Sequence, residues 1–500
     1  MVGKGGPSRA APRGALAALV GVVVTAVLLG LQLPADPATG VTFSMSPFTD
    51  EGWSVLPARN QVLLGRWIVD DWPLVWVQAP FSAVMAVAFS AFGVGIIQAR
   101  LVSIVVSIVA VGLIGGLLAR RFGEAAGVVA GVGLATCALF LYYGRLALLE
   151  PMVTMLLVAG AAVLLRRPRI PGAVGTDLGA SLAAALLFGL AIATKASAAA
   201  AIVGLLVGAA LAVTGGGEAT RAMRRRLATA AIATAAIGIG YAAIVVAQPG
   251  LTAAIARIWP DATGPDSVVE AITRALSYVR GSDGAIGLTA PMIAGSLVGV
   301  ALLVARWRLM RPEQRVLAGA AVGWLVAGLG LLLIVDYRPN RYVVPMLPPM
   351  AVLTGIGAGI GLDLLGGRWS AWRRPAAVTA AATVVAILLG AAGIGTLAGW
   401  MSTATYRLPE IQAEVLELAD DGRPIQGAVT MAMRVPVPTL IVQSDVNAGD
   451  LYDSPGVRWL LTNRDATPAW AAAHPEAWAA RETLACYPWP SGEACLIRVP

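Results

Sequence analysis

The sequence predicts an all-α polytopic membrane protein with about eleven transmembrane helices and a small α/β domain at its C-terminal end. The 500-residue chain is 58% hydrophobic and only 13% charged, whereas soluble domains are about half apolar and a quarter charged. Long apolar runs recur through residues 15–399, and arginine clusters separate them at regular intervals. Residues 400–500 have a different composition.

The apolar runs supply the spans. A spanning helix needs about 20 mostly apolar residues, and twelve runs approach that length. They are roughly residues 15–33, 74–96, 98–119, 125–142, 147–165, 178–194, 196–214, 227–248, 286–305, 316–335, 343–365 and 376–399. The first run follows a basic tail and exceeds the usual 7–15 residues of a signal-peptide core. We therefore interpret it as the first span.

The arginine clusters decide which runs cross the membrane, because basic residues near span ends mark the cytoplasmic side. From residue 98 onward, a cluster follows every second run. The clusters are Arg120–Arg121, Arg166–Arg167–Arg169, Arg221 with Arg224–Arg226, Arg306–Arg308–Arg311–Arg315, and Arg368 with Arg373–Arg374. They share the side of the basic N-terminal tail only if one run before residue 98 does not cross.

The run 74–96 is the one that we expect not to cross. It follows Asp70 and Asp71 and contains Gln78 and Pro80, which suits a helix at the membrane surface better than a span. Eleven spans then remain, with the N-terminus in the cytoplasm and the C-terminal domain outside a plasma (inner) membrane. The predicted segments are a cytoplasmic tail (1–14), a transmembrane domain (15–399), outer loops (34–97 and 249–285), surface helices near 51–66 and 74–93, and an outer domain (400–500).

The segment 400–500 predicts a small α/β domain. The helix-like stretch LPEIQAEVLELADDG alternates with β-rich stretches such as VRWLLTN and ACLIRV, a pattern typical of mixed structure. Cys486 and Cys495 lie in this segment. Disulfides persist outside the bacterial cytoplasm, so the predicted location and the two cysteines agree on a disulfide between them.

Polar residues collect at the predicted outer ends of the spans. Taken singly, each has a plainer interpretation: Arg and Lys extend to lipid headgroups, and Asp50 could cap a helix. Taken together, they suggest chemistry, because Arg binds phosphate oxygens and a carboxylate can accept a proton from a hydroxyl group. The residues are Asp50, Glu51, Arg100, Arg145, Glu150, Lys195, Arg338, Arg341 and Tyr342.

The motifs for nucleotide and metal sites are missing. The chain has no glycine-rich phosphate loop of the nucleotide-binding types, and we expect no nucleic-acid partner. Its one histidine, His474, has no second histidine or cysteine at metal-binding spacing. We therefore expect no required cofactor, although a divalent ion near Glu150 stays open.

Four regions of sequence carry a family resemblance over about residues 15–365. They are TDEGW after the first span; WPLVWVQAPFSAVMAVAFSAFG followed by IIQARLVSIV; YYGRLALLEPMVT; and AIATKAS with NRYVVPMLPPMAVL. In this order they resemble the membrane-embedded glycosyltransferases that use polyprenyl-phosphate sugars. This group includes protein O-mannosyltransferases and the transferases that put aminoarabinose on lipid A. One departure, DDWPL where many relatives have Lys or His-Pro-Pro, speaks against protein mannosylation specifically.

The resemblance implies a fold of the GT-C type and a function. A sugar would pass from a polyprenyl-phosphate donor to a hydroxyl group of a glycan, lipid or protein on the outer face, with inversion. Asp50 would be the general base, and Glu51 would position the acceptor or the base. The candidate phosphate ligands are Arg100, Arg145, Lys195, Arg338 and Arg341, of which Arg100 and Lys195 match the family pattern best. Further candidate contacts are Trp53, Glu150 and Tyr342.

Two other functions compete with this one. A transporter or flippase of a lipid-linked sugar predicts charged residues and broken helices in the middle of spans, and the apolar runs have almost none. A non-catalytic cell-envelope assembly protein predicts that Asp50 is dispensable. The sugar and the acceptor stay open at this point.

Overall fold

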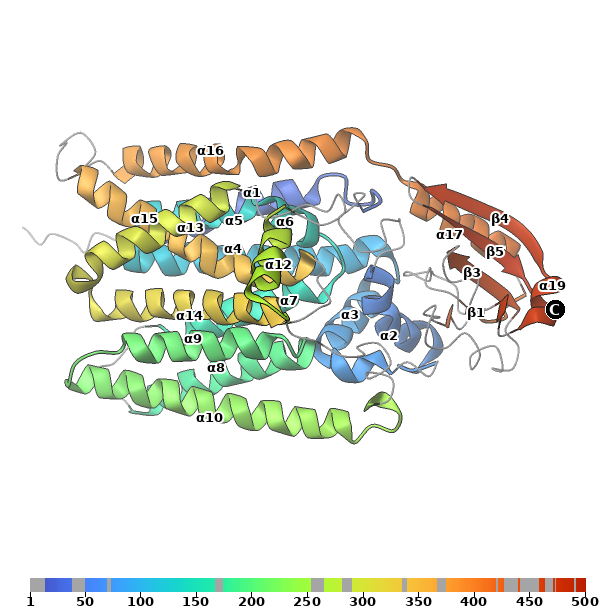
Figure 1. Cartoon of the computed structure of the whole chain (residues 1–500), viewed down its shortest axis with the longest axis horizontal. Helices are drawn as coiled ribbons and strands as arrows, with labels where there is room; N and C mark the ends of the chain where they lie inside the picture. Colours follow the sequence, from blue (N-terminus) through green and yellow to red (C-terminus); the bar gives the residue numbers. More distant parts are fainter. Residues whose placement is uncertain are drawn as a thin grey trace, which may run out of the picture.

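The protein is a helical bundle with a small sheet domain at one end (Figure 1). The structure is a computed structural model. It describes residues 14–37, 50–69, 73–166, 174–252, 265–280, 290–334, 340–366, 375–419, 421–426, 439–440, 458–463, 471–472, 474–489 and 492–500.

Eleven helices correspond to the eleven predicted spans, and the bundle runs along the horizontal direction of Figure 1. Among the described residues, six helices are long and apolar enough to cross a membrane, and shorter apolar helices accompany them. The eleven are α1 (Ala15–Gly30), α4 (Ile96–Phe122), α5 (Glu124–Ala135), α7 (Leu149–Leu164), α8 (Val174–Thr194), α9 (Ala198–Ala212), α10 (Glu218–Val246), α13 (Ala290–Arg306), α14 (Pro312–Ile334), α15 (Leu347–Gly366) and α16 (Pro375–Ser402). The predicted multi-pass fold is confirmed.

Glycine allows a close helix contact between α9 and α14. A Cβ atom on Gly208 would lie 2.1 Å from the Gly319 carbonyl oxygen, and one on Gly204 would lie 2.2 Å from the Gly323 carbonyl oxygen. Only a residue without a side chain fits at such a distance. Small residues take this role in membrane helices because association there depends on close backbone packing.

The predicted run 125–142 is two helices rather than one. α5 ends at Ala135, and α6 (Ala138–Tyr143) follows after a break at Thr136 and Cys137. The Thr136 hydroxyl donates a hydrogen bond to the Val132 carbonyl at 2.8 Å, a contact that often bends helices. α16 packs directly against the break, where a Cβ atom on Gly393 would lie 2.0 Å from the Thr136 carbonyl oxygen.

The described residues of four arginine clusters gather at one end of the bundle and bond to each other's helices, whereas Arg368, Arg373 and Arg374 lie outside the described residues. Arg226 donates to the Leu164 and Arg166 carbonyls at 3.1 and 2.7 Å. Arg311 donates to the Arg121 carbonyl at 3.0 Å. Sequence-distant clusters therefore share one end, here called the basic end, as the topology required.

The described part of the predicted first outer loop lies at the opposite end of the bundle (Figure 1). Its helices α2 (Glu51–Leu64) and α3 (Ala79–Phe92) lie between the bundle and the sheet domain in Figure 1, joined by the short 3-10 helix η1 (Leu74–Val77). Gln78 ties them together by donating to the Ser54 carbonyl at 2.7 Å. Both helices fall where the sequence predicted surface helices. The amphipathic α12 (Val268–Arg280), from the predicted second outer loop, runs across the bundle direction (Figure 1).

The C-terminal domain is α/β, as predicted. Its sheet has the strand order β2-β1-β3-β5-β4; β1 runs parallel to β2 and β3, and β5 runs antiparallel to β3 and β4. A disulfide joins Cys486 and Cys495, which face each other across β4 and β5. The elements are α17 (Arg407–Leu418), β1 (Ile425–Gln426), β2 (Thr439–Leu440), β3 (Trp459–Asn463), α19 (Pro475–Ala479), β4 (Glu482–Trp489) and β5 (Gly492–Arg498).

Candidate active site

Four candidate residues meet at the end of the bundle opposite the basic end, each from a different helix terminus. Asp50 precedes α2, Glu150 is in the first turn of α7, and Lys195 lies between α8 and α9. Arg341 belongs to the 3-10 helix η3 (Asn340–Met346), which leads into α15. Helix termini bring these residues together because neighbouring spans end at the same membrane surface.

The four side chains form one network of opposite charges, here called the Arg341 cluster. Arg341 Nη1 pairs with Asp50 Oδ2, and Arg341 Nε lies 3.5 Å from Glu150 Oε1. Lys195 Nζ lies 2.5 Å from the same Glu150 oxygen. Two cations therefore neutralise two carboxylates at this site.

An aromatic ring holds the two cations in place. Lys195 Nζ lies 3.7 Å from the centroid of the Tyr342 ring, and Arg341 Cζ lies 5.6 Å from it. Both distances are within the range of cation–π attraction. Tyr342, a candidate ligand contact from the sequence, thus packs against the cations themselves.

The two carboxylates of the cluster differ in burial, which indicates different roles for them. The Glu150 side chain is 2% exposed, and that of Asp50 is 37% exposed. Asp50 is therefore the carboxylate open to an incoming molecule. Burial lowers the pKa of the Lys195 ammonium below its ordinary value, and the Glu150 carboxylate offsets part of that effect. Asp50 makes no side-chain capping hydrogen bond to α2, so the capping interpretation has no support.

Glu51 and Arg100 form a separate buried ion pair. Arg100 Nε and Nη2 donate to the two Glu51 carboxylate oxygens at 2.9 and 2.8 Å, and the Ala147 N–H donates to Glu51 Oε1 at 2.8 Å. Arg100 Nη1 donates to the Leu33 and Ala35 carbonyls at 2.7 Å each. Protein oxygens thus accept hydrogen bonds from all three guanidinium nitrogens, which favours a role in holding the outer loop over one in binding a phosphate.

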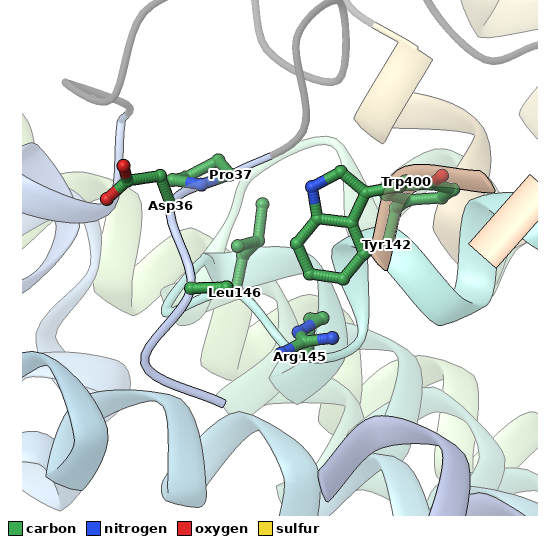
Figure 2. Close-up of a pocket in the computed structure, with 7 residues that line it drawn as sticks. Asp36, Pro37, Tyr142, Arg145, Leu146 and Trp400 are labelled. Atoms are coloured by element: carbon green, nitrogen blue, oxygen red, sulfur yellow. The ribbon is translucent and has the colours of Figure 1, made fainter. Parts of the chain in front are cut away.

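Arg145 lies apart from the Arg341 cluster, beside Trp400 at the end of α16. Its Nη2 donates to the Gln32 carbonyl at 2.6 Å, and its Cζ lies 4.6 Å from the centroid of a Trp400 ring. Burial, with the nearby Arg100 charge, lowers its pKa to about 10, so it stays cationic at neutral pH. Figure 2 shows it in a small pocket formed with Trp400 and with the residues Ala35, Asp36, Pro37, Tyr142 and Leu146.

Two further candidates are not placed in the cluster. Trp53 is half-buried in α2. Arg338 lies outside the described residues. Asp36 was missed by the sequence analysis, although it lies between two prolines directly after the first span.

The cluster's donor set does not fit a divalent cation. Asp50 and Glu150 already pair with Arg341 and Lys195, which a metal ion would have to displace. Within the described ranges, the one group with three ligands at metal-binding distance is Cys486, Glu493 and Cys495, and its two sulfurs form the disulfide. We therefore assign no step to a metal ion.

The bundle with its outer-loop helices has the fold of the GT-C membrane glycosyltransferases. Residues 78–245 match the model of the family described as dolichyl-phosphate-mannose-protein mannosyltransferase. Over most of its length the chain is similar to ArnT from Cupriavidus metallidurans in the apo state, at 18% identity. That alignment covers 96% of this chain and 97% of ArnT with a TM-score of 0.62.

A second similar structure is the Archaeoglobus fulgidus oligosaccharyltransferase in complex with Zn and sulfate. It shares 13% identity over 96% of this chain and 72% of that chain, with a TM-score of 0.55. No curated protein matches the chain at the level of sequence. The resemblance that the sequence motifs indicated is confirmed by the fold and by the matched segment.

Proposed function

We propose that the protein is an integral-membrane glycosyltransferase that moves a sugar from a polyprenyl-phosphate donor to a hydroxyl acceptor, with Asp50 as the general base. The observation that carries this proposal is the Arg341 guanidinium, which connects Asp50 and Glu150 beside Lys195. A partly open carboxylate and two cations are the groups that such a transfer requires.

Lys195 and Arg341 would bind the donor phosphate. ArnT from Cupriavidus metallidurans has been crystallised with undecaprenyl phosphate, and the Archaeoglobus fulgidus AglB structure contains a dolichol-phosphate. A phosphate entering this chain's cluster would compete with the carboxylates for the same two cations. Arg341 would then turn from Asp50 to the phosphate, which leaves Asp50 free to act.

The transfer is a single displacement at the anomeric carbon. The acceptor oxygen forms the new bond as the bond from the anomeric carbon to the phosphate oxygen breaks, which inverts the configuration. The hydroxyl proton passes to Asp50, a step typically worth 10²–10⁴-fold. Lys195 and Arg341 stabilise the charge of the departing polyprenyl phosphate, and this stabilisation is strongest where water is excluded.

The charge distribution supports an outer location for the reaction. The basic end carries the arginine clusters that mark the cytoplasmic side, and the Arg341 cluster lies at the opposite end. The reaction would therefore take place on the outer face of the plasma membrane, with the N-terminus inside. Glu51 would act through Arg100 in fixing the loop rather than touch the acceptor.

The proposal is tested with Asp50→Asn in reconstituted membranes supplied with a panel of labelled polyprenyl-phosphate sugars. We expect transfer to fall by about 10²–10⁴-fold while donor binding is retained. Asp266→Asn is the matched control, because Asp266 is an exposed acid directly before α12. Unchanged transfer by Asp50→Asn would refute the base assignment.

A further inference from the structure

The Asp36 carboxylate binds the first turn of α17, the helix that opens the C-terminal domain. Its Oδ1 accepts a hydrogen bond from the Leu408 N–H at 3.0 Å, and its Oδ2 accepts from the Arg407 N–H at 2.8 Å. The Thr405 hydroxyl also donates to Oδ2 at 2.7 Å. The Asp36 N–H in turn donates to the Thr405 carbonyl at 2.8 Å.

This arrangement replaces a cap that α17 lacks. Tyr406, the residue at the N-cap position, makes no side-chain capping hydrogen bond. A carboxylate at a helix N-terminus satisfies free N–H groups and interacts favourably with the helix dipole. Asp36 supplies that carboxylate from the far end of the sequence and is itself 5% exposed. The contact is therefore a built connection between the first outer loop and the C-terminal domain.

Apolar contacts reinforce the connection. Ile96, the first residue of α4, belongs to the same buried cluster as Leu408, Ile411 and Val415 of α17. Figure 2 shows Asp36 and Pro37 above Leu146, with Trp400 beside them. The C-terminal domain thus packs on the segment that follows α1. Arg100 and Arg145 donate hydrogen bonds to backbone carbonyls of the same segment.

One guanidinium joins this segment to the catalytic candidate. The Ala35 carbonyl, next to Asp36, accepts a hydrogen bond from Arg100 Nη1, and Arg100 Nε and Nη2 hold both oxygens of Glu51. Glu51 is the neighbour of Asp50 in the chain. A continuous series of hydrogen bonds and one ion pair therefore leads from α17 to the residue beside Asp50.

We propose that Asp36 is a positioning residue: by docking the C-terminal domain on the first outer loop, it fixes Asp50 through Arg100 and Glu51. This inference rests on the proposed function, because it gives the docked domain a part in setting the general base. The C-terminal domain is then a component of the catalytic unit rather than an independent appendage.

The first test is Asp36→Ala in the full-length reconstituted protein. A general base displaced by about 1 Å can cost on the order of 10²-fold in rate. We therefore expect kcat to fall by up to about 10²-fold while the donor KM does not rise, because Lys195 and Arg341 remain to bind the donor phosphate. Asp421→Ala is the matched control, since Asp421 bonds to Trp459 and Arg423 within the C-terminal domain. It should leave kcat unchanged.

The second test is independent of activity. Hydrogen exchange in Asp36→Ala should quicken at the first turn of α17 and also at the start of α2, where the Ser54 N–H bonds to the Asp50 carbonyl. Faster exchange at α17 alone would mean that Asp36 docks the C-terminal domain without affecting the start of α2. That result would overturn the proposal. This measurement is valid even if the wild type transfers no sugar from the panel, a result that would count against the proposed function instead.

The third test replaces the connection with a covalent one. The double variant Asp36→Cys with Thr405→Cys should recover kcat when oxidised and lose it when reduced. Each single cysteine variant and the wild type, treated alike, control for reduction of the native disulfide. The double cysteine variant also tests the proposal if Asp36→Ala fails to fold. Wild-type kcat in Asp36→Ala, beside an inactive Asp50→Asn, would refute the positioning role and leave the proposed function standing.

Discussion

Arg341 contacts both carboxylates of the candidate site: its Nη1 pairs with Asp50, and its Nε lies 3.5 Å from Glu150 Oε1. The arrangement keeps Asp50 neutralised until another anion engages the guanidinium. Binding of a donor phosphate and release of the base would therefore be one event, which limits proton abstraction to the loaded site.

Replacing Arg341 should weaken donor binding more than folding. In Arg341→Gln we expect the donor KM to rise roughly 10- to 100-fold, because charge-assisted hydrogen bonds contribute about 1.5–3 kcal/mol. Arg341→Lys should lie between wild type and Arg341→Gln, since lysine keeps the charge but lacks the planar guanidinium. Initial rates over a donor series measure this. Unaltered KM in both variants would remove Arg341 from the donor site.

Lys195 should give transfer an alkaline limit. Burial lowers the pKa of its ammonium from the ordinary value of 10.5, so the cation loses its proton as pH rises through this lowered value. We expect phosphate binding and transfer to fall at a pH below 10.5. Lys195→Arg should move the limit upward, because arginine stays charged. A pH–rate profile measures the limit, and an identical profile for both proteins would contradict its assignment to Lys195.

The pair of Glu51 and Arg100 should matter for stability. Both side chains are at most 1% exposed, and removing one partner of a buried ion pair typically costs about 3–5 kcal/mol. We expect Glu51→Gln to lower the unfolding temperature of the purified protein clearly. Asp50→Asn should lower it much less, because Asp50 is partly exposed. Thermal unfolding in detergent compares the two, and equal shifts would show that the pair has no special structural part.

Transfer should continue in the presence of a chelator. The two carboxylates of the Arg341 cluster already pair with Lys195 and Arg341, which leaves no free donor set there. We expect full activity after treatment with EDTA. A loss of activity that Zn²⁺, Mg²⁺ or Mn²⁺ restores would show that a metal ion displaces these cations in the working enzyme.

The orientation of the protein in the membrane can be tested with two single cysteine substitutions. Arg66, after α2, and Arg120, at the end of α4, are both exposed at opposite ends of the bundle. An impermeant thiol reagent added to intact cells should label Arg66→Cys and spare Arg120→Cys. Background labelling should be low, because Cys137 is buried and the other two cysteines are joined. The reverse result would invert the topology.

Hydropathy and charge predicted the bundle well because both patterns can be read from residues that are close together in the sequence. The arginine clusters predicted that the run 74–96 does not cross the membrane, and the structure has η1 and α3 there, between the bundle and the sheet domain (Figure 1). Periodic hydropathy did not reveal the break at Thr136, because the break depends on contact with α16, which lies much later in the sequence.

The sequence predicted the candidate residues but not which of them lie together. It ranked Arg100 with Lys195 as a phosphate ligand, whereas Arg100 pairs with Glu51 and Lys195 pairs with Glu150. Pairing of charges follows from three-dimensional distance, which motif order does not contain. Asp36 gave no signal beyond its neighbouring prolines, since its partners are contributed by Thr405, Arg407 and Leu408.

That last separation has a consequence for biosynthesis. Asp36 and Leu408 lie 372 residues apart, and N-terminal segments fold first during translation. The Asp36 carboxylate therefore lacks its partners Thr405, Arg407 and Leu408 while the bundle is inserted into the membrane. In the proposed topology, the contact forms only when α17 has crossed the membrane. A chain that ends before residue 407 would contain all of the spans. It would lack the hydrogen bonds from Arg407 and Leu408 that hold Asp36.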